Sequence, residues 1–272
     1  MKRLHGYLAT LDVLGFSDML QRDGYSKVLM NYMTCVNEVI RPAHTDVECV
    51  VFSDSIVLTS KGVNDAAFEN IVRACSAAFY ALLKNEIPVR GAIAFGTYWR
   101  EHRAGSVFLA GRPIVEAYRC ERDSEWVGIL LCTSVLLHRE SLSDDTLIHT
   151  ADDDDEVTLE QLKELHAHSA TAFRLQPAKV PMRDETNGRV DDFAGYAIVP
   201  MEADGDGSTA ARNVQTAKNA LWDLRFKASR PKAQAKYQAS MAFLDEVQPQ
   251  LESVAKLYRR ARKAKLKALE RL

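Results

Sequence analysis

The stretch that decides the fold reads Val50-Val51-Phe52-Ser53-Asp54-Ser55-Ile56-Val57-Leu58. A polar Ser-Asp-Ser triplet separates two mainly β-branched apolar runs, which is typical of two strands joined by a tight turn. Serine and aspartate favour turns because their side chains can hydrogen-bond to nearby backbone groups. The sequence therefore predicts a β-hairpin over residues 46–60, with the carboxylate of Asp54 at its tip. Either solvent or a cation could satisfy that carboxylate.

A second carboxylate, Asp12, stands in a similar setting upstream. Residues 5–14 alternate loosely and predict a first strand that ends at Asp12 or just beyond it. The next residues, Gly15 to Asp18, predict the start of a helix with Ser17 or Asp18 as its N-cap, running to about residue 40. If this helix crosses over the sheet, the first strand and the hairpin lie side by side, and Asp12 meets Asp54.

The remainder of the chain alternates strands and helices as far as a late polar loop. The pattern predicts a helix over residues 64–83, a strand over 88–96, a helix from Pro113, a strand over 126–131, a short helix to about residue 138, an acidic surface loop over 144–156, a short helix over 159–167, late strands over 173–180 and 193–201, and helix beyond 209. A hairpin inside this order requires a partly antiparallel sheet, which indicates an α+β fold and argues against a doubly wound dinucleotide fold. We expect one domain over residues 1–201 and a helical extension over 202–272.

Composition narrows the classes of function. The chain has 272 residues, 47% of them hydrophobic, so it can bury a full core, and its net charge of -2 argues against a general polyanion binder. The five cysteines lack the spacing of a zinc site and predict reduced, buried thiols; they are Cys35, Cys49, Cys75, Cys120 and Cys132. No apolar run reaches transmembrane length. We therefore expect a cytoplasmic protein without stable membrane insertion.

The last helix is strongly basic. Its positive residues are Lys256, Arg259, Arg260, Arg262, Lys263, Lys265, Lys267 and Arg271. Such a helix either packs on the body or on a second subunit with a solvated face, or contacts an anionic surface or a nucleic acid. Aromatic residues do not alternate with the basic ones as they would in an RNA-binding segment, and we expect no DNA partner.

A pair of aspartates beside a glycine turn suggests a class of chemistry. Two close carboxylates repel each other, and a cation between them relieves this repulsion. Oxygen ligands suit Mg²⁺ or Mn²⁺, which retain water ligands and accept phosphate oxygens from a substrate. The amides that follow Asp12, at Gly15 and its neighbours, are a natural seat for phosphate. Together these features indicate transfer of a phosphoryl or nucleotidyl group.

Four motifs in order resemble the catalytic domain of class III nucleotidyl cyclases, the adenylate and guanylate cyclases. They read Asp12-Val13-Leu14-Gly15-Phe16-Ser17, Phe52-Ser53-Asp54-Ser55, Ile87-Pro88-Val89-Arg90-Gly91-Ala92-Ile93-Ala94-Phe95-Gly96 and Gly111-Arg112-Pro113-Ile114-Val115-Glu116-Ala117-Tyr118-Arg119-Cys120-Glu121. The chain is still more similar to the short bacterial pyrimidine cyclases of Pycsar antiphage defence. The resemblance covers roughly residues 4–140, and more weakly the strands to about 201.

The resemblance implies a ferredoxin-like, mostly antiparallel sheet with helices packed on it, and it implies a set of site residues. Asp12, Val13 and Asp54 would hold two Mg²⁺ or Mn²⁺ ions, and Arg119 would neutralise charge on the α-phosphate from across a head-to-tail homodimer. Substrate contacts are expected from Val13, Leu14, Gly15, Phe16, Val50, Arg90 and Arg112. Lys179 is a further candidate for reaching phosphate.

Two positions depart from the family pattern. The transition-state asparagine is replaced by Val115, and the purine-selecting lysine is replaced by Val50. Both changes fit a pocket rebuilt for a smaller base, and the candidates for reading a pyrimidine are Tyr98, Arg90, Glu48 and Arg112. We expect UTP as substrate, with CTP next, a cyclic messenger in antiphage defence and a separate effector protein that binds it.

Two other hypotheses stay open. The chain could be a non-catalytic nucleotide-sensing module on a cyclase fold, because the asparagine is missing. It could also be a nucleic-acid-binding or scaffold protein that acts through its basic C-terminal helix.

Overall fold

The structure is a computed structural model that describes residues 1–21, 24–40, 46–60, 62–103, 106–138, 173–184, 186–202, 205 and 207–269. The acidic segment 144–156 and the helix expected over 159–167 lie outside the described residues. Side chains beyond residue 260 also lie outside them, so the exposed face of the last basic turns stays a prediction.

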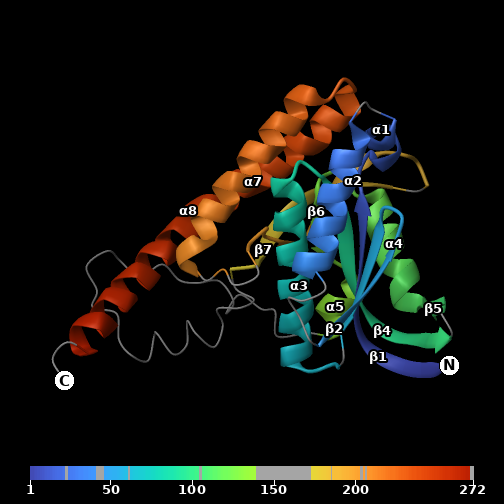
Figure 1. Cartoon of the computed structure of the whole chain (residues 1–272), viewed down its shortest axis with the longest axis horizontal. Coiled ribbons are helices and arrows are strands. Elements are labelled where there is room, and N and C mark those ends of the chain that lie inside the picture. Colours follow the sequence, from blue (N-terminus) through green and yellow to red (C-terminus); the bar gives the residue numbers. More distant parts are fainter. Residues whose placement is uncertain are drawn as a thin grey trace.

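The first half of the chain forms a β-α-β-β-α-β unit. Its elements are β1 (Lys2–Val13), α1 (Phe16–Leu20), α2 (Tyr25–Thr34) with a π-helical continuation (Cys35–Ile40), β2 (Val47–Phe52), β3 (Ser55–Ser60), α3 (Asp65–Lys84) and β4 (Val89–Arg103). The strands lie in the order β2-β3-β1-β4, and all three pairings are antiparallel. This is the ferredoxin-like arrangement, so the predicted fold class is confirmed (Figure 1).

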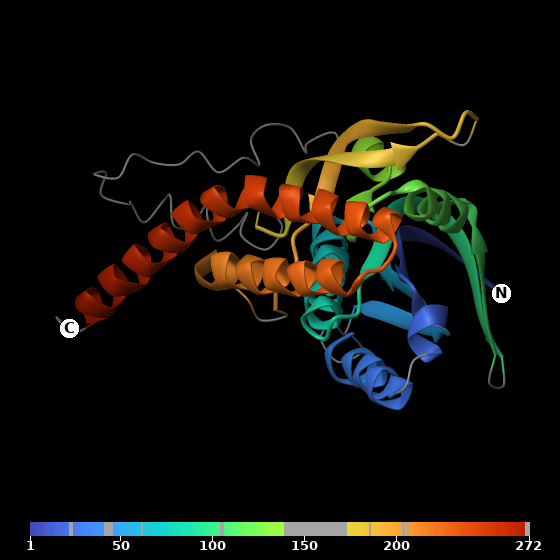
Figure 2. The same ribbon diagram turned by 90° about the horizontal axis from the view of Figure 1, so that it is seen from above.

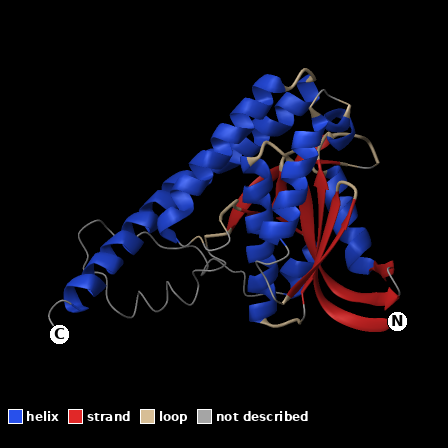
Figure 3. Cartoon of the chain, in the orientation of Figure 1, coloured by secondary structure: helices blue, strands red, loops and turns tan. Residues whose placement is uncertain are grey.

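Later elements widen the same sheet. They are β5 (Ser106–Gly111), α4 (Arg112–Asp123), β6 (Gly128–Leu131), α5 (Thr133–His138), β7 (Leu175–Arg183) and β8 (Val190–Ile198). The order continues β4-β6-β8-β7, while β5 folds back on the distal part of β4. Among the described strands, only the β4–β6 pairing is parallel. Figure 3 shows this sheet with helices on both of its faces.

The alternation of side chains along β1 assigns its residues to the two faces. Tyr7, Ala9 and Leu11 belong to the main core beneath α3, whereas Leu8 belongs to a smaller cluster that also contains Ala117 of α4. Because side chains in a strand alternate with a period of two, Asp12 lies on the α4 face of the sheet. The register of β1 thus determines on which side of the sheet any chemistry of Asp12 takes place.

The C-terminal helices α7 (Gly207–Lys227) and α8 (Pro231–Leu269) form an antiparallel pair that extends away from the sheet (Figure 2). Both helices pack on the body: Val214 and Leu221 of α7 and Leu244 of α8 are buried in the main core. Ser240 of α8 also accepts a hydrogen bond from the amide of Val127 at 2.8 Å. The division of the chain at residue 201 stays a prediction.

Three local details differ from the sequence analysis. The first helix is capped by Gly15 in the left-handed region (φ 72°), without a side-chain cap from Ser17 or Asp18, because this conformation turns the chain sharply out of β1. The helix expected to run to residue 40 is interrupted, and α2 begins after Gly24, which also has positive φ. The second hairpin, β4–β5, was not anticipated.

Helix α3 matches its prediction over residues 64–83 closely. Its N-cap Asn64 accepts a hydrogen bond from the amide of Ala67 at 3.0 Å. Among the described residues, α3 is the one helix long and apolar enough to cross a membrane, and 78% of its apolar window is buried inside the protein. That burial is expected of a helix packed on a sheet.

Candidate active site

The two aspartates lie at one end of adjacent strands. Asp12 is paired with Ser55 of β3 on one side and with Arg90 of β4 on the other. The amide of Val13 donates a hydrogen bond to the carbonyl oxygen of Asp54 at 3.1 Å. The topology therefore brings Asp12 and Asp54 together, as the sequence analysis expected, while their catalytic role stays a prediction.

The turn that carries Asp54 is held by a buried tyrosine. Ser53 adopts a left-handed conformation (φ 56°), and its carbonyl accepts a hydrogen bond from the hydroxyl of Tyr32 at 3.0 Å. Tyr32 packs edge-on against Phe16 with ring centroids 5.6 Å apart. Burial raises the pKa of Tyr32 to about 12, and the charge of Asp54 adds to this effect. The phenol thus stays protonated and able to donate its hydrogen bond.

An arginine lies between two carboxylates at this end of the sheet. Nε and an Nη of Arg90 each lie 3.3 Å from Oδ2 of Asp12. Nε also lies 3.4 Å from Oε1 of Glu121, and the guanidinium donates to the carbonyl of Arg122 at 3.1 Å. Arg90 was expected to contact substrate; in this structure it forms ion pairs with Asp12 and Glu121. We call the group Asp12, Asp54, Arg90 and Glu121 the acidic site.

Glu121 is the member that sequence reasoning missed. Its side chain is only 5% exposed. Burial raises its pKa to about 7, with the charge of Asp12 acting in the same direction and Arg90 opposing it. A signal was present in the sequence, since Pro113, Ala117 and Glu121 follow at spacings of four and all three are buried. A glutamate that continues the apolar stripe of a helix faces the sheet and needs a partner there.

The acidic site fits a hard divalent cation. Burial raises the pKa of Asp12, Arg90 opposes that shift, and the charge of Asp54 raises the pKa further. The repulsion between Asp12 and Asp54 is what a shared cation would relieve. Within the described residues no group of three His, Cys, Asp or Glu side chains could hold a metal. Two carboxylates with backbone oxygens and water are nevertheless a donor set that Mg²⁺ accepts.

The expected phosphate seat after Asp12 is only partly available. The amide of Val13 is occupied by Asp54, and the amide of Leu14 donates to the carbonyl of Pro88 at 2.8 Å. These two backbone amides therefore already have acceptors in this structure, and the expected substrate contacts of Val13 and Leu14 stay a prediction. Only the amides of Gly15 and Phe16 remain candidates.

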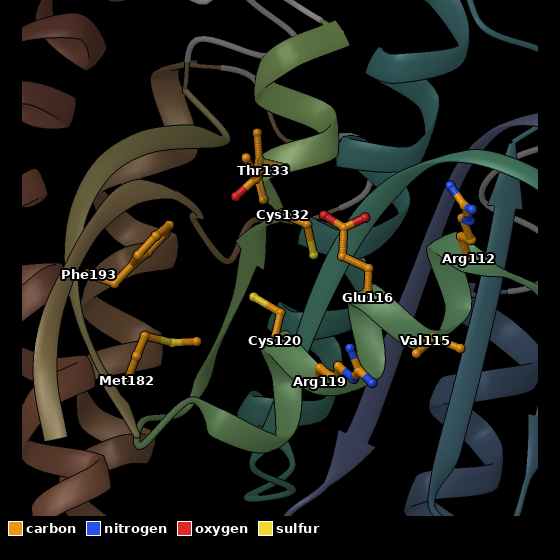
Figure 4. A pocket seen from close by; sticks show the side chains of 10 residues that line it. Arg112, Val115, Glu116, Arg119, Cys120, Cys132, Thr133, Met182 and Phe193 are labelled. Carbon is orange, nitrogen blue, oxygen red and sulfur yellow. The ribbon is translucent and has the colours of Figure 1, made fainter. Parts of the chain in front are cut away.

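Arg119, Arg112 and Val115 lie elsewhere, on α4. With Glu116 and Cys120 they line one wall of a cavity of about 550 Å³, which we call the α4 pocket. Figure 4 shows Met182 and Phe193 of the β7–β8 hairpin across the cavity from this helix. The lining of the α4 pocket includes neither Asp12 nor Asp54. Within a single chain, the expected transition-state arginine thus lines a cavity that neither expected metal ligand lines.

Four candidates for substrate contacts lie outside both the acidic site and the lining of the α4 pocket. Val50 pairs with Val57 on β2–β3 and is half-buried, and Glu48 forms an ion pair with Arg100. Tyr98 is 1% exposed, and its hydroxyl lies 3.4 Å from the carbonyl of Ser60, so it is not available to read a base. Lys179 is exposed on β7.

Comparisons with known proteins give similarity in structure alone. No family model matches the chain, and no curated protein matches it in sequence. Similar solved structures include the dimeric guanylyl cyclase domain of the RhoGC fusion protein from the aquatic fungus Blastocladiella emersonii. The two sequences are 15% identical, the match covers 52% of this chain and 86% of that chain, and the TM-score is 0.44. The guanylyl cyclase Cya2 has 11% identity, coverage of 74% and 94%, and a TM-score of 0.45. The adenylyl cyclase CyaB from P. aeruginosa has 13% identity, coverage of 75% and 100%, and a TM-score of 0.46. At these values the similarity carries no conclusion about activity, and the fold rests on the strand order described above.

Proposed function

We propose that this chain is a nucleotidyl cyclase that converts a pyrimidine nucleoside triphosphate into a 3′,5′-cyclic nucleotide and pyrophosphate. The observation that carries the proposal is the convergence of Asp12 and Asp54 at one end of β1 and β3. Such a carboxylate pair, followed directly by the Gly15 turn, suits the binding of a metal–triphosphate complex.

The residues of the acidic site would divide the work. Asp12 and Asp54 would hold two Mg²⁺ or Mn²⁺ ions, which supply activation of the ribose 3′-hydroxyl and charge neutralisation of the triphosphate. In the reaction the 3′-oxygen forms a bond to the α-phosphorus, the bond from that phosphorus to the β-bridging oxygen breaks, and the hydroxyl proton passes to water. Arg90 can exchange its ion pair with Asp12 for a phosphate oxygen, since its side chain is 18% exposed.

A second copy of the chain would complete the site. Arg119 is exposed on α4 and lines the α4 pocket, which neither Asp12 nor Asp54 lines. In a head-to-tail homodimer, Arg119 of one copy would meet the aspartates of the other and stabilise charge on the α-phosphate. Two sites per dimer follow from this symmetry.

The proposal also includes a preferred base and a biological role. Val50 offers no hydrogen bond to a base edge, which suits a substrate other than ATP or GTP. We favour UTP, with CTP next, and a cyclic messenger that serves antiphage defence through a separate effector protein.

The test is product identification by mass spectrometry after incubation with each of the four nucleoside triphosphates and Mn²⁺. We expect cyclic UMP as the main product and none from Asp54→Asn. The absence of a cyclic product from every triphosphate, or full activity in the variant, would contradict the proposal.

A second candidate is a non-catalytic nucleotide-sensing module. The observation that favours it is Val115, an apolar and half-exposed side chain at the position where the family has its transition-state asparagine. Tight nucleotide binding that needs no metal and gives no turnover would support this function over the first.

A further inference from the structure

A second pocket lies where the C-terminal helices meet the start of α1. Its volume is about 470 Å³. One wall includes Leu14 and Gly15, the second and third residues after Asp12, and the other comes from residues 224–237 of α7, α8 and their connection. Figure 1 shows this connection beside α1, at the opposite end of the helical pair from the C-terminus. We call it the basic pocket, after the residues described next.

The basic side chains are Lys227, Arg230, Lys232 and Lys236, and all four line the pocket. Lys227 pairs with Glu86, and Arg230 lies 3.5 Å from Asp18. The other two share one carboxylate: Lys232 and Lys236 lie 3.4 Å and 3.2 Å from oxygens of Glu125.

Glu125 is also the partner of Arg183, whose Nε lies 2.8 Å from it. The lining of the basic pocket itself contains four basic side chains and two carboxylates, those of Asp18 and Glu86, which leaves an excess of two positive charges. An excess of positive charge beside a cavity favours an anion.

Lys236 connects this pocket with the acidic site. Its side chain is only 14% exposed. Burial lowers the pKa of Lys236, Glu125 opposes that shift, and the charge of Arg90 adds to it. The charge of Lys236 in turn opposes the rise that burial causes in the pKa of Asp12. The ammonium group is thus within electrostatic reach of both Asp12 and Arg90, although Lys236 is more than two hundred residues away from Asp12 in sequence.

We propose that the basic pocket binds the β- and γ-phosphates of the substrate, with Lys232 and Lys236 of α8 as the phosphate ligands. The inference rests on the proposed function and extends it, because it makes the C-terminal helical pair part of the substrate site. A triphosphate tail is the polyanion that would bridge Gly15 and α8 when its α-phosphate lies at Asp12. Lysine binds such a ligand as a mobile positive charge. The phosphate tail would replace Glu125 as the ion-pair partner of the two ammonium groups.

The experiment measures binding of inorganic tripolyphosphate to the full chain by calorimetry, in the absence of divalent ions. We expect Lys232→Met and Lys236→Met each to weaken binding about tenfold, and Lys236→Arg to retain most of it. Lys218→Met is the matched control, since Lys218 lies on the same helical pair, loses the same charge and pairs with Asp245 outside the pocket. The side chain of Lys232 is 63% exposed, so we expect its variant to keep the fold.

Glu125→Gln separates ligand binding from a structural role. If Lys232 and Lys236 only fasten α8 to the body through Glu125, this variant weakens α8 packing and does not improve anion binding. If they are phosphate ligands, it frees their charges, and we expect tripolyphosphate to bind about threefold or more tightly.

Equal affinity in the wild type and both lysine variants would overturn the inference. So would an unchanged KM for the nucleotide in an active Lys232→Met enzyme. The wild type could bind tripolyphosphate, the two lysine variants could lose that binding, and the wild type could still make no cyclic product from any triphosphate. That result would support the anion site and contradict only the cyclase proposal.

Discussion

The acidic site and the α4 pocket lie on the same face of one sheet, yet their charged side chains differ in exposure and in pairing. In the acidic site the side chains of Asp12, Arg90 and Glu121 are at most a quarter exposed, and Arg90 forms ion pairs with both carboxylates. In the α4 pocket Arg112 and Arg119 are exposed. A site that binds a metal–phosphate complex needs fixed carboxylates, whereas a residue that approaches from a second subunit must stay accessible. Under the proposed function, the two would be halves of one reaction centre that a second copy brings together.

The largest effect is expected from the acidic half. Asp54→Asn removes a charged oxygen ligand while keeping the shape of the turn, so cyclase activity should fall by about a thousandfold or more, the equivalent of ~4 kcal/mol. Initial rates of cyclic product formation with Mn²⁺ measure this. Asp46→Asn is the control, because Asp46 is exposed at the start of the same hairpin. A comparable loss in both variants would indicate that the hairpin as a whole, and not a metal ligand, had been damaged.

A mixing experiment tests whether the two halves work across a dimer. Asp54→Asn and Arg119→Ala chains should each be nearly inactive alone. Mixed in equal amounts and allowed to exchange, they should regain about a quarter of wild-type activity, since half of the dimers are mixed and each holds one intact site of two. If Arg119 acted within its own chain, no chain in the mixture would be complete and activity would stay at the level of the variants alone.

The fold followed from local patterns, because each of its early elements carries its own periodicity. The hairpin around Asp54 and the apolar stripe of α3 both matched their predicted bounds to within a few residues. Errors came where backbone geometry overrode propensity: Ser17 and Asp18 are good capping residues, but Gly15 turned the chain before they could act.

The site was less accessible to sequence reasoning. Asp12 and Asp54 could be paired because the order of strands made β1 and β3 neighbours. The spacing within α4 indicates that Glu121 faces the sheet, but its partner Arg90 and the contribution of Lys236 could not be found in this way, since they depend on where β4 and α8 lie in the fold. Such contacts between distant segments are tertiary information, and no spacing of residues in the chain encodes them.

Glu121 offers a prediction that concerns only the acidic half. Its pKa of about 7 in the folded protein exceeds the ordinary value of 4.5, so the folded state binds more protons than the unfolded state between these pH values. The free energy of unfolding should therefore fall as the pH rises from 5 to 8, by up to about 3 kcal/mol from this group. Urea unfolding at a series of pH values should show that Glu121→Gln loses this component.

The matched control is Glu246→Gln, since Glu246 is exposed on α8. It should keep the pH dependence of the wild type. A pH profile of Glu121→Gln that matches the wild type would mean that Glu121 is ionised throughout, held by Arg90.

The smallest effect concerns the support of the turn. Tyr32→Phe deletes the hydroxyl that donates to the Ser53 carbonyl and leaves the ring in contact with Phe16. The loss of one partly buried hydrogen bond should lower the free energy of unfolding by about 1 kcal/mol, measured by urea unfolding against Tyr25→Phe, whose ring is 46% exposed. Because Ser53 precedes Asp54, the Tyr32→Phe enzyme should need more Mn²⁺ for half-maximal activity. Arg119→Ala should lower the activity of this enzyme by the same factor as it lowers that of the wild type. An altered Arg119 effect would show that the turn and α4 are coupled within one chain, and the separation between the two halves would then fail.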